Sequence, residues 1–424
     1  MLNSKQQYAL NCMMHGKNMF ITGDAGTGKS YVVNKFIDDC KLKNKQIIVC
    51  APTGIAAINI GGVTAHRIFK IPIKPLIESP RAIPTTLKDA DVILIDEVSM
   101  LRIDVFEYIA TVLFALNSFR RQRGLDDIQV VLVGDFFQLP PVITDKDREV
   151  LEKYKYGEDL GKGFAFQSKY WDAFNFVCVQ LDEVVRQDDK VFIQNLNYIR
   201  YGDYRGIRYF NEMSKKHEIK DAILVCGTNK AVNQKNEAEY KKIKNKEFIY
   251  DAEIDGEVAE SDKIVPDKLK LKVGCRVMTV INDYAGKYQN GTLATVTYLD
   301  EEKIIILTDD GEQAEIEPYT WDINNYSANN IKSKVKIKLD CIGTYTQYPL
   351  RLAYAVTVHK SQGQTFDKVN LNPYCWDCGQ LYVALSRVRN INGLYLTEPI
   401  RASYLIASSK VKEFYMSIRN FLKI

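Results

Sequence analysis

A glycine-rich loop near the start of the chain constrains its fold more than any other feature. Residues 23–30 read Gly-Asp-Ala-Gly-Thr-Gly-Lys-Ser, which is the pattern G-x-x-x-x-G-K-S. Residues 18–22 before it predict a short buried strand, and residues 31–40 after it carry apolar side chains at helical spacing. Such a turn can be an ordinary connection, but between a strand and a helix it predicts a phosphate-binding loop.

The residue types in this loop suit a nucleoside triphosphate. Gly23, Gly26 and Gly28 let the backbone turn tightly, so that its N–H groups and the positive end of the following helix face a polyphosphate. We expect Lys29 to reach the β- and γ-phosphates of ATP and the Ser30 hydroxyl to bind Mg²⁺.

Two further apolar runs bring polar residues to strand ends. Residues 91–95 end at Asp96 and Glu97; we expect Asp96 to hold Mg²⁺ through its water shell and Glu97 to deprotonate the attacking water. Residues 130–133 lead to Gln138, which can sense the γ-phosphate. Hydrophobic strands interleaved with helices predict a doubly wound parallel α/β sheet, and the two sites together predict triphosphate hydrolysis.

Three polar residues of the first half are candidates for ligand contact. Gln6 precedes the phosphate loop, and its amide offers the donor and acceptor that the edge of adenine requires, although a solvated side chain fits equally well. Thr53 and His66 are expected on loops at the carboxyl ends of strands, where open α/β sheets bind ligands. A capping threonine and a surface histidine remain the alternative.

From about residue 176 the strand and helix pattern begins again, which predicts a second α/β domain. Arg186 follows its first predicted strand, and Arg387 lies on a helix predicted over residues 380–388. A guanidinium that reaches the γ-phosphate from a second domain would couple hydrolysis to closure. Two surface arginines in salt bridges remain the alternative.

Two segments interrupt the α/β pattern. Residues 68–86 contain four prolines and predict a small excursion without regular helix or central strand. Residues 281–345 alternate in short strands with turn signals and predict an inserted β-barrel. The chain then returns to a strand that ends at His359 and Lys360, in a loop rich in phosphate and sugar donors.

Composition sets limits without choosing a function. A chain of 424 residues with 46% hydrophobic content predicts several domains, and a net charge of +4 argues neither for nor against a polyanionic partner. The nine cysteines have no repeating spacing, and no apolar run is long enough for a signal peptide or a membrane span. We expect an intracellular protein, in the cytoplasm or nucleoid if its source is bacterial, with no membrane partner.

Taken in order, these motifs resemble the PIF-type (petite integration frequency) 5′-to-3′ DNA helicases of superfamily one. The segments that carry the resemblance are residues 2–6, 23–30, 51–57, 61–69, 96–100, 134–142, 181–202, 228–236, 356–365 and 382–387. The Ala-Pro-Thr-Gly sequence at residues 51–54 is also similar to RecD-like helicases.

The resemblance implies two RecA-like P-loop domains with parallel sheets. The first would span residues 1–175, with a wedge excursion at about 67–86. The second would comprise residues 176–280 and 346–424, with an SH3-like β-barrel at 281–345 inserted in it.

The resemblance also implies ATP- and Mg²⁺-driven movement along single-stranded DNA and unwinding of duplexes, and of RNA–DNA hybrids or quadruplexes, in replication, repair, recombination or telomere-type maintenance. Single-stranded and forked DNA would be the partners of a monomer that can dimerise on DNA. The positions that would serve ATP are Lys29, Ser30, Asp96, Glu97, Gln138, Arg186 and Arg387. Those that would contact DNA are Thr53, His66, His359 and Lys360. A RecD-like or RNA-directed motor and a non-unwinding ATP switch remain alternatives.

Overall fold

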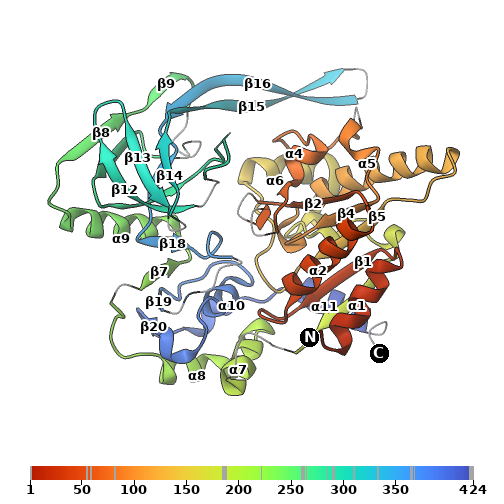
Figure 1. Cartoon of the computed structure of the whole chain (residues 1–424), viewed down its shortest axis with the longest axis horizontal. Helices are drawn as coiled ribbons and strands as arrows, with labels where there is room; N and C mark the ends of the chain where they lie inside the picture. Colours follow the sequence, from red (N-terminus) through yellow and green to blue (C-terminus); the bar gives the residue numbers. More distant parts are fainter. Residues whose placement is uncertain are drawn as a thin grey trace. The chain divides into compact units, whose positions relative to one another are not determined.

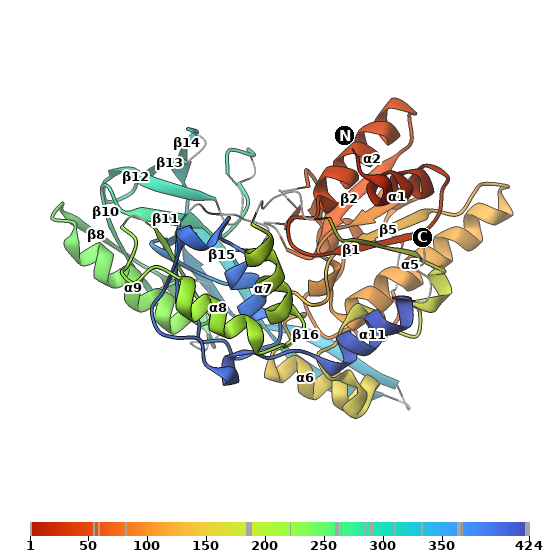
Figure 2. The same ribbon diagram turned by 90° about the horizontal axis from the view of Figure 1, so that it is seen from below.

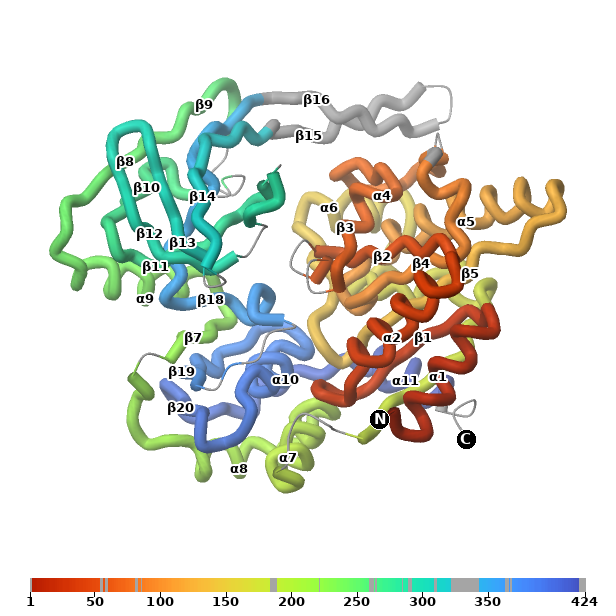
Figure 3. Tube along the Cα trace, in the orientation of Figure 1, coloured from red at the N-terminus to blue at the C-terminus, as the bar shows by residue number. Residues whose placement is uncertain are grey.

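The structure is a computed structural model, and Figure 3 follows its trace. It describes residues 2–53, 56–57, 60–80, 83–183, 189–220, 222–258, 263, 265–283, 285–288, 292–308, 311–331, 334–362, 366 and 368–419, without the side chains of residues 85, 322–331, 334–342 and 419. The chain divides into two compact units, one of Met1–Gly227 with Ser361–Ile424 and the other of Thr228–Lys360.

A six-stranded parallel sheet organises the first unit, with strand order β3-β2-β4-β5-β1-β6. Most of these strands read as continuous apolar runs because helices cover both faces of the sheet. Their bounds are β1 Met19–Gly23, β2 Ile47–Ala51, β3 Val63–Thr64, β4 Val92–Ile95, β5 Gln129–Val133 and β6 Val177–Leu181.

Helices lie on both faces of this sheet (Figure 1), and alternate residues of β1 belong to two different hydrophobic clusters. Met19 and Ile21 pack against α1 (Ser4–Met14) and α2 (Lys29–Leu42), whereas Phe20 packs in the core of α5 (Ile103–Gln122) and α11 (Ser409–Arg419). The ring of Phe414 on α11 lies 6.0 Å from that of Phe20. The last helix of the chain therefore belongs to the core of the first sheet.

The strand β6 differs from its prediction. The sequence pattern predicts that residues 177–181 open a second domain, but β6 pairs in parallel with β1 at the edge of the first sheet, with Ile21 opposite Val179. The apolar pattern identifies the strand correctly; it carries no information about which neighbour supplies the hydrogen bonds.

Between the strands, most of the excursion predicted at residues 68–86 is irregular, but Ile68 and Phe69 belong to a short helix and residues 85–86 to a 3₁₀ turn. Among the described residues, 70–80 and 83–84 form no helix or strand. The remaining short helices of this region are α4 Ala65–Phe69 and α6 Asp145–Leu151, the 3₁₀ turns Thr85–Leu87, Val98–Met100, Gly157–Leu160, Ala165–Gln167 and Asp172–Phe174, and the π-turn Glu152–Tyr156.

The rest of the first unit contains three more parallel strands, in the order β7-β19-β20. They are β7 Ile223–Cys226, β19 Val369–Leu371 and β20 Leu394–Leu396. The accompanying helices are α7 Lys190–Arg200, α8 Arg205–Met213 and α10 Gln380–Leu385, with 3₁₀ turns at Ile391–Gly393 and Ala402–Tyr404. Figure 2 shows α7 and α8 side by side.

The second unit is mainly antiparallel. Five strands pair in the order β14-β13-β12-β11-β17, β8 pairs with β10, and a long ribbon of β15 and β16 is extended by β9. The bounds are α9 Asn229–Lys242, β8 Glu247–Asp251, β9 Glu253–Gly256, β10 Lys268–Lys272, β11 Arg276–Thr279, β12 Leu293–Leu299, β13 Ile304–Thr308, β14 Gln313–Ile316, β15 Tyr319–Ile331, β16 Lys334–Gln347, β17 Leu350–Leu352 and β18 Ala355–Thr357.

The antiparallel sheet extends beyond the range 281–345 expected for a barrel, because β11 and β17 flank that range and pair with each other. In the part of the chain that the structure describes, we find no helix with the length and apolar character needed to cross a membrane.

Candidate active site

The phosphate loop lies between β1 and α2, in the strand-loop-helix setting that the sequence predicts. Gly23, Gly26 and Gly28 all have positive φ angles, of 149°, 84° and 78°. The left-handed backbone conformation favours glycine at position 28, where a Cβ atom would also displace the Gln6 amide, which is 2.7 Å away. Ser30 is exposed in the first turn of α2.

Lys29 folds back over this loop. Its Nζ donates hydrogen bonds to the carbonyl oxygens of Gly23 (2.8 Å) and Asp24 (3.0 Å). Burial lowers the pKa of Lys29, and the carboxylates of Asp135 and Glu97 oppose that effect. The ammonium group is therefore held among negative charges, at the position where it can bind a polyphosphate.

Gln6 contacts the same loop from α1. Its Nε2 donates to the carbonyl oxygen of Thr27 (3.1 Å), and its Oε1 accepts from the backbone N–H of Asn3 (3.0 Å) in a capping box. The amide thus connects the start of α1 to the phosphate loop. Adenine recognition by Gln6 stays a prediction.

The carboxylate pair follows β4 as expected. Asp96 accepts a hydrogen bond from the backbone N–H of Glu97 through Oδ1 (2.8 Å). Glu97 has φ 51°, a left-handed conformation that is costly for a residue with a side chain and that clusters at functional sites. Burial, and then the neighbouring Glu97, raise the pKa of Asp96 to about 7; burial also raises the pKa of Glu97, against the opposing charge of Lys29.

A glutamine from the last part of the chain brings two predicted residues together. Nε2 of Gln362 donates to Oε2 of Glu97 (2.9 Å) and lies 3.4 Å from Oε1 of Gln138. The sequence places Gln362 in a donor-rich loop without assigning it to the ATP site. In the sequence, Gln362 lies two residues after Lys360. This position fits a contact with DNA as well as a role in the ATP site, so the sequence does not decide between them.

Arg387 is buried in the same unit, just after α10 rather than on it. Its Nε donates to the Val383 carbonyl (2.8 Å) and one terminal nitrogen donates to the Ser361 carbonyl (3.2 Å). The helix ends at Leu385, earlier than the predicted residue 388, and the side chains of Ser386 and Arg387 both donate to the Val383 carbonyl in its last turn. The charge of Arg387 also favours the ionised form of Glu97. Arg186, the other predicted arginine, lies outside the described residues.

The four predicted DNA contacts fall in both units. In the first, Thr53 follows β2 and its Oγ1 accepts from the Ala56 N–H (3.3 Å). His66 is on α4 instead of the expected loop, because the Thr64 side chain accepts from the Arg67 N–H and starts a helical turn. In the second, His359 and Lys360 lie in a turn after β18.

Comparison with known proteins decides the family. The model for PIF1-like helicases matches residues 1–205. The ATP-dependent DNA helicase Pif1 of Campylobacter jejuni is 31% identical, with 96% of this chain and 96% of that protein covered, and that of Bdellovibrio bacteriovorus is 30% identical, with 98% and 91% covered.

The chain belongs to the PIF1-like helicase family.

Solved structures of this family match the fold along nearly the whole chain. Bacteroides Pif1 bound to single-stranded DNA has a TM-score of 0.83 at 32% identity, over 99% of this chain and 97% of that chain. The Bacteroides enzyme in complex with ADP-AlF3 and single-stranded DNA also has a TM-score of 0.83 at 32% identity, with 99% and 98% covered.

One buried cluster of this PIF1-like chain is absent from the sequence-based prediction. Arg200, the last residue of α7, has a completely buried side chain that forms ion pairs with Asp24 of the phosphate loop (2.8 Å) and with Asp135 (2.9 Å). A signal is present in the sequence, because Arg200 is four residues after Leu196 and eight after Phe192 and so shares their buried helix face. The pattern gives no indication of the two carboxylates that Arg200 meets.

Proposed function

We propose that this PIF1-like chain is an ATP-dependent DNA helicase, which hydrolyses ATP and moves 5′-to-3′ along single-stranded DNA to unwind duplexes. The observation that carries the proposal is the contact of Gln362 with both Glu97 and Gln138, in the same unit as the phosphate loop of Lys29. The family relatives named Pif1 are ATP-dependent DNA helicases, which favours a PIF-type motor over a RecD-like one.

Each residue of the site then has a role in hydrolysis. Lys29 binds the β- and γ-phosphates, and Glu97 accepts the proton of the attacking water. Gln138 senses the γ-phosphate, and the Gln362 amide holds the Gln138 side chain beside Glu97. Arg387 neutralises the charge that develops on the γ-phosphate, with Arg186 as its predicted partner.

The donor set also suits Mg²⁺. Asp96 supplies a carboxylate and Ser30 a hydroxyl, which are the hard oxygen ligands that this ion prefers. The pKa of Asp96 is raised by burial and by Glu97, so a divalent cation would relieve a repulsion that the protein already contains. Mg²⁺ bound there would neutralise the phosphate oxygens of ATP.

We further propose how this chain holds DNA. Thr53, His66, His359 and Lys360 contact the backbone of single-stranded or forked DNA, the irregular excursion acts as a wedge, and the antiparallel sheet of the second unit forms an SH3-like barrel. Two molecules cooperate at a fork, as two coordinating Pif1 helicases do at forked DNA in a solved structure with a TM-score of 0.84 to this chain. The activity serves DNA replication, repair or recombination inside the cell.

Strand separation on tailed duplexes tests the function. We expect ATP-dependent unwinding of a duplex with a 5′ single-stranded tail and none of the same duplex with a 3′ tail. Unwinding of only the 3′-tailed substrate would contradict the polarity. ATP hydrolysis that single-stranded DNA stimulates, without unwinding of either substrate, would reduce the protein to a translocase or switch, and RNA-tailed duplexes would reveal an RNA-directed motor.

The Lys29→Ala variant tests the ATP site within this function. We expect it to lose ATP hydrolysis and unwinding while it keeps most of its affinity for single-stranded DNA, because the DNA contacts are elsewhere. Fluorescence anisotropy with a labelled oligonucleotide measures the affinity. A Lys29→Ala protein that still unwinds duplexes would show that the ATP site lies elsewhere.

A further inference from the structure

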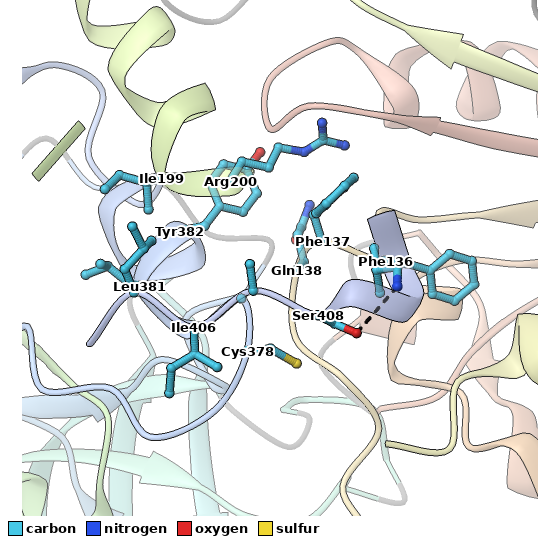
Figure 4. A pocket seen from close by; sticks show the side chains of 14 residues that line it. Phe136, Phe137, Gln138, Ile199, Arg200, Cys378, Leu381, Tyr382, Ile406 and Ser408 are labelled. Carbon is cyan, nitrogen blue, oxygen red and sulfur yellow. Dashed lines mark hydrogen bonds between the residues drawn. The ribbon is translucent and has the colours of Figure 1, made fainter. Parts of the chain in front are cut away.

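The proposed mechanism leaves one buried ion cluster without a role. Figure 4 shows Arg200 extending past the ring of Phe137, and its guanidinium lies 4.4 Å from the centre of that ring. Nε and a terminal nitrogen donate to the two carboxylate oxygens of Asp135 at 3.2 and 2.9 Å. The other terminal nitrogen donates to the Tyr201 hydroxyl (2.7 Å) and approaches Oδ1 of Asp24 (2.8 Å). One guanidinium therefore forms ion pairs with two carboxylates.

The two carboxylates belong to two parts of the ATP site. Asp24 is the second residue of the phosphate loop, and its carbonyl oxygen accepts from Nζ of Lys29 (3.0 Å) and Oγ1 of Thr27 (2.9 Å). Asp135 begins the turn that delivers Gln138, whose backbone N–H donates to the Asp135 carbonyl (2.8 Å). Arg200 thus connects the loop that binds phosphate to the segment that senses it.

The position of Asp24 makes this pairing consequential. Its side chain is only 14% exposed, and it lies in a loop whose ligand carries several negative charges. A buried carboxylate without a partner would repel that ligand and would pull the loop toward water. The raised pKa of Asp24 comes first from burial and is opposed first by Arg200.

The same loop is held from a second side. The backbone N–H of Ala25 donates to the Tyr382 hydroxyl (2.9 Å), and Tyr382 lies beside Arg200 in Figure 4. Residues far apart in the chain thus fix the outer part of the phosphate loop, at Asp24 and Ala25.

Resting on the proposed ATP hydrolysis, we propose that Arg200 is a positioning residue for nucleotide binding: it neutralises Asp24 and so keeps the phosphate loop in the shape that accepts a triphosphate. The Arg200 side chain is completely buried, and its donors are already directed at Asp24, Asp135 and Tyr201. Its loss would therefore act on ATP affinity more than on the chemical step. A purely structural ion pair would instead affect folding and leave the KM for ATP unchanged.

A double-mutant cycle in the full-length protein separates these roles. We expect Arg200→Gln to raise the KM for ATP by about tenfold or more, with a smaller loss in kcat, in ATPase assays at saturating single-stranded DNA. Asp24→Asn should lower KM by about twofold, because it removes a negative charge beside the triphosphate. In the Arg200→Gln/Asp24→Asn double variant, KM should return most of the way toward the wild-type value.

Controls keep the result specific. Arg208→Gln is the matched variant, since Arg208 is 83% exposed on α8 in a pair with Glu212 and should leave KM unchanged. Arg200→Lys keeps the charge but not the paired geometry, and should give an intermediate KM even if Arg200→Gln fails to fold. Equal KM values for Arg200→Gln and the double variant, or a change confined to kcat, would overturn the inference. Absence of ATPase activity in the wild-type protein would instead refute the proposed function.

Discussion

Gln362 donates from its amide nitrogen to Oε2 of Glu97 at 2.9 Å, and this hydrogen bond joins the proposed catalytic base to the last part of the chain. The amide oxygen of Gln362 is buried and has no hydrogen-bond partner among the described residues. The hydrogen bond from the amide nitrogen supports Gln362 as a residue that orients the Glu97 carboxylate.

Replacing Gln362 should reduce hydrolysis without abolishing nucleotide binding. For Gln362→Leu we expect kcat for ATP to fall by about tenfold to a hundredfold, since Glu97 loses the amide donor that orients it while the phosphate loop is unchanged. Steady-state ATPase assays with single-stranded DNA measure the effect. Gln194→Leu, on the exposed side of α7, is the matched control. A wild-type kcat in Gln362→Leu would show that Glu97 needs no such support.

Gly379 tests how closely α10 must approach the Gln138 segment. A Cβ atom there would lie 2.2 Å from the Gln138 carbonyl oxygen and 2.6 Å from that of Phe137, at a φ angle of 75°. We expect Gly379→Ala to lower the free energy of unfolding by about 2–4 kcal/mol, from backbone strain and overpacking together. Urea denaturation followed by circular dichroism measures the change.

A matched substitution at Gly16 separates backbone strain from overpacking. It has the same φ angle of 75°, but nothing lies within 4 Å of the position that a Cβ atom would take, so Gly16→Ala adds the strain without the overpacking. We expect that variant to lose only about 1 kcal/mol. Equal losses in the free energy of unfolding for the two variants would mean that the close approach of Gly379 to Gln138 does not contribute to the destabilisation.

Asn236 organises the second unit around α9. Its Nδ2 donates to the Leu352 carbonyl (2.9 Å), and its Oδ1 accepts from the N–H groups of Tyr354 (2.7 Å) and Ala355 (2.8 Å). Asn236→Ala would remove these three hydrogen bonds to the backbone, and we expect a loss of about 2–4 kcal/mol in the free energy of unfolding. Hydrogen exchange at residues 354 and 355 should rise sharply. Asn233→Ala, on the same helix, should change neither quantity.

The sequence predicts which residues form strands better than it predicts which strands pair with each other. The runs that form β1, β2, β4 and β5 are recognisable because parallel strands buried on both faces are continuously apolar. The strand β6 is recognisable too, but its pairing with β1 is not, since nothing in residues 177–181 specifies a neighbour.

The same limit applies to the site. Lys29, Asp96 and Glu97 can be found in the sequence because local motifs carry their chemistry. Arg200 and Gln362 cannot be assigned to the site in this way because their partners, Asp24 and Glu97, are distant in sequence, and such contacts exist only after the chain has folded.

If Lys360 contacts DNA as proposed, the affinity for DNA should depend on pH. Burial, and then the nearby charge of Arg351, lower the pKa of Lys360 to about 8. The side chain is therefore charged at pH 7 and mostly neutral at pH 9, whereas binding of a DNA phosphate requires the charged form. We expect the affinity for single-stranded DNA to fall by about tenfold between pH 7 and pH 9 at constant salt, because each unit above the pKa costs about a factor of ten. Lys360→Arg keeps its charge throughout this range and should bind with nearly constant affinity. If its affinity falls as steeply as that of the wild-type protein in anisotropy titrations, another group controls the pH dependence and Lys360 does not contact the phosphate backbone.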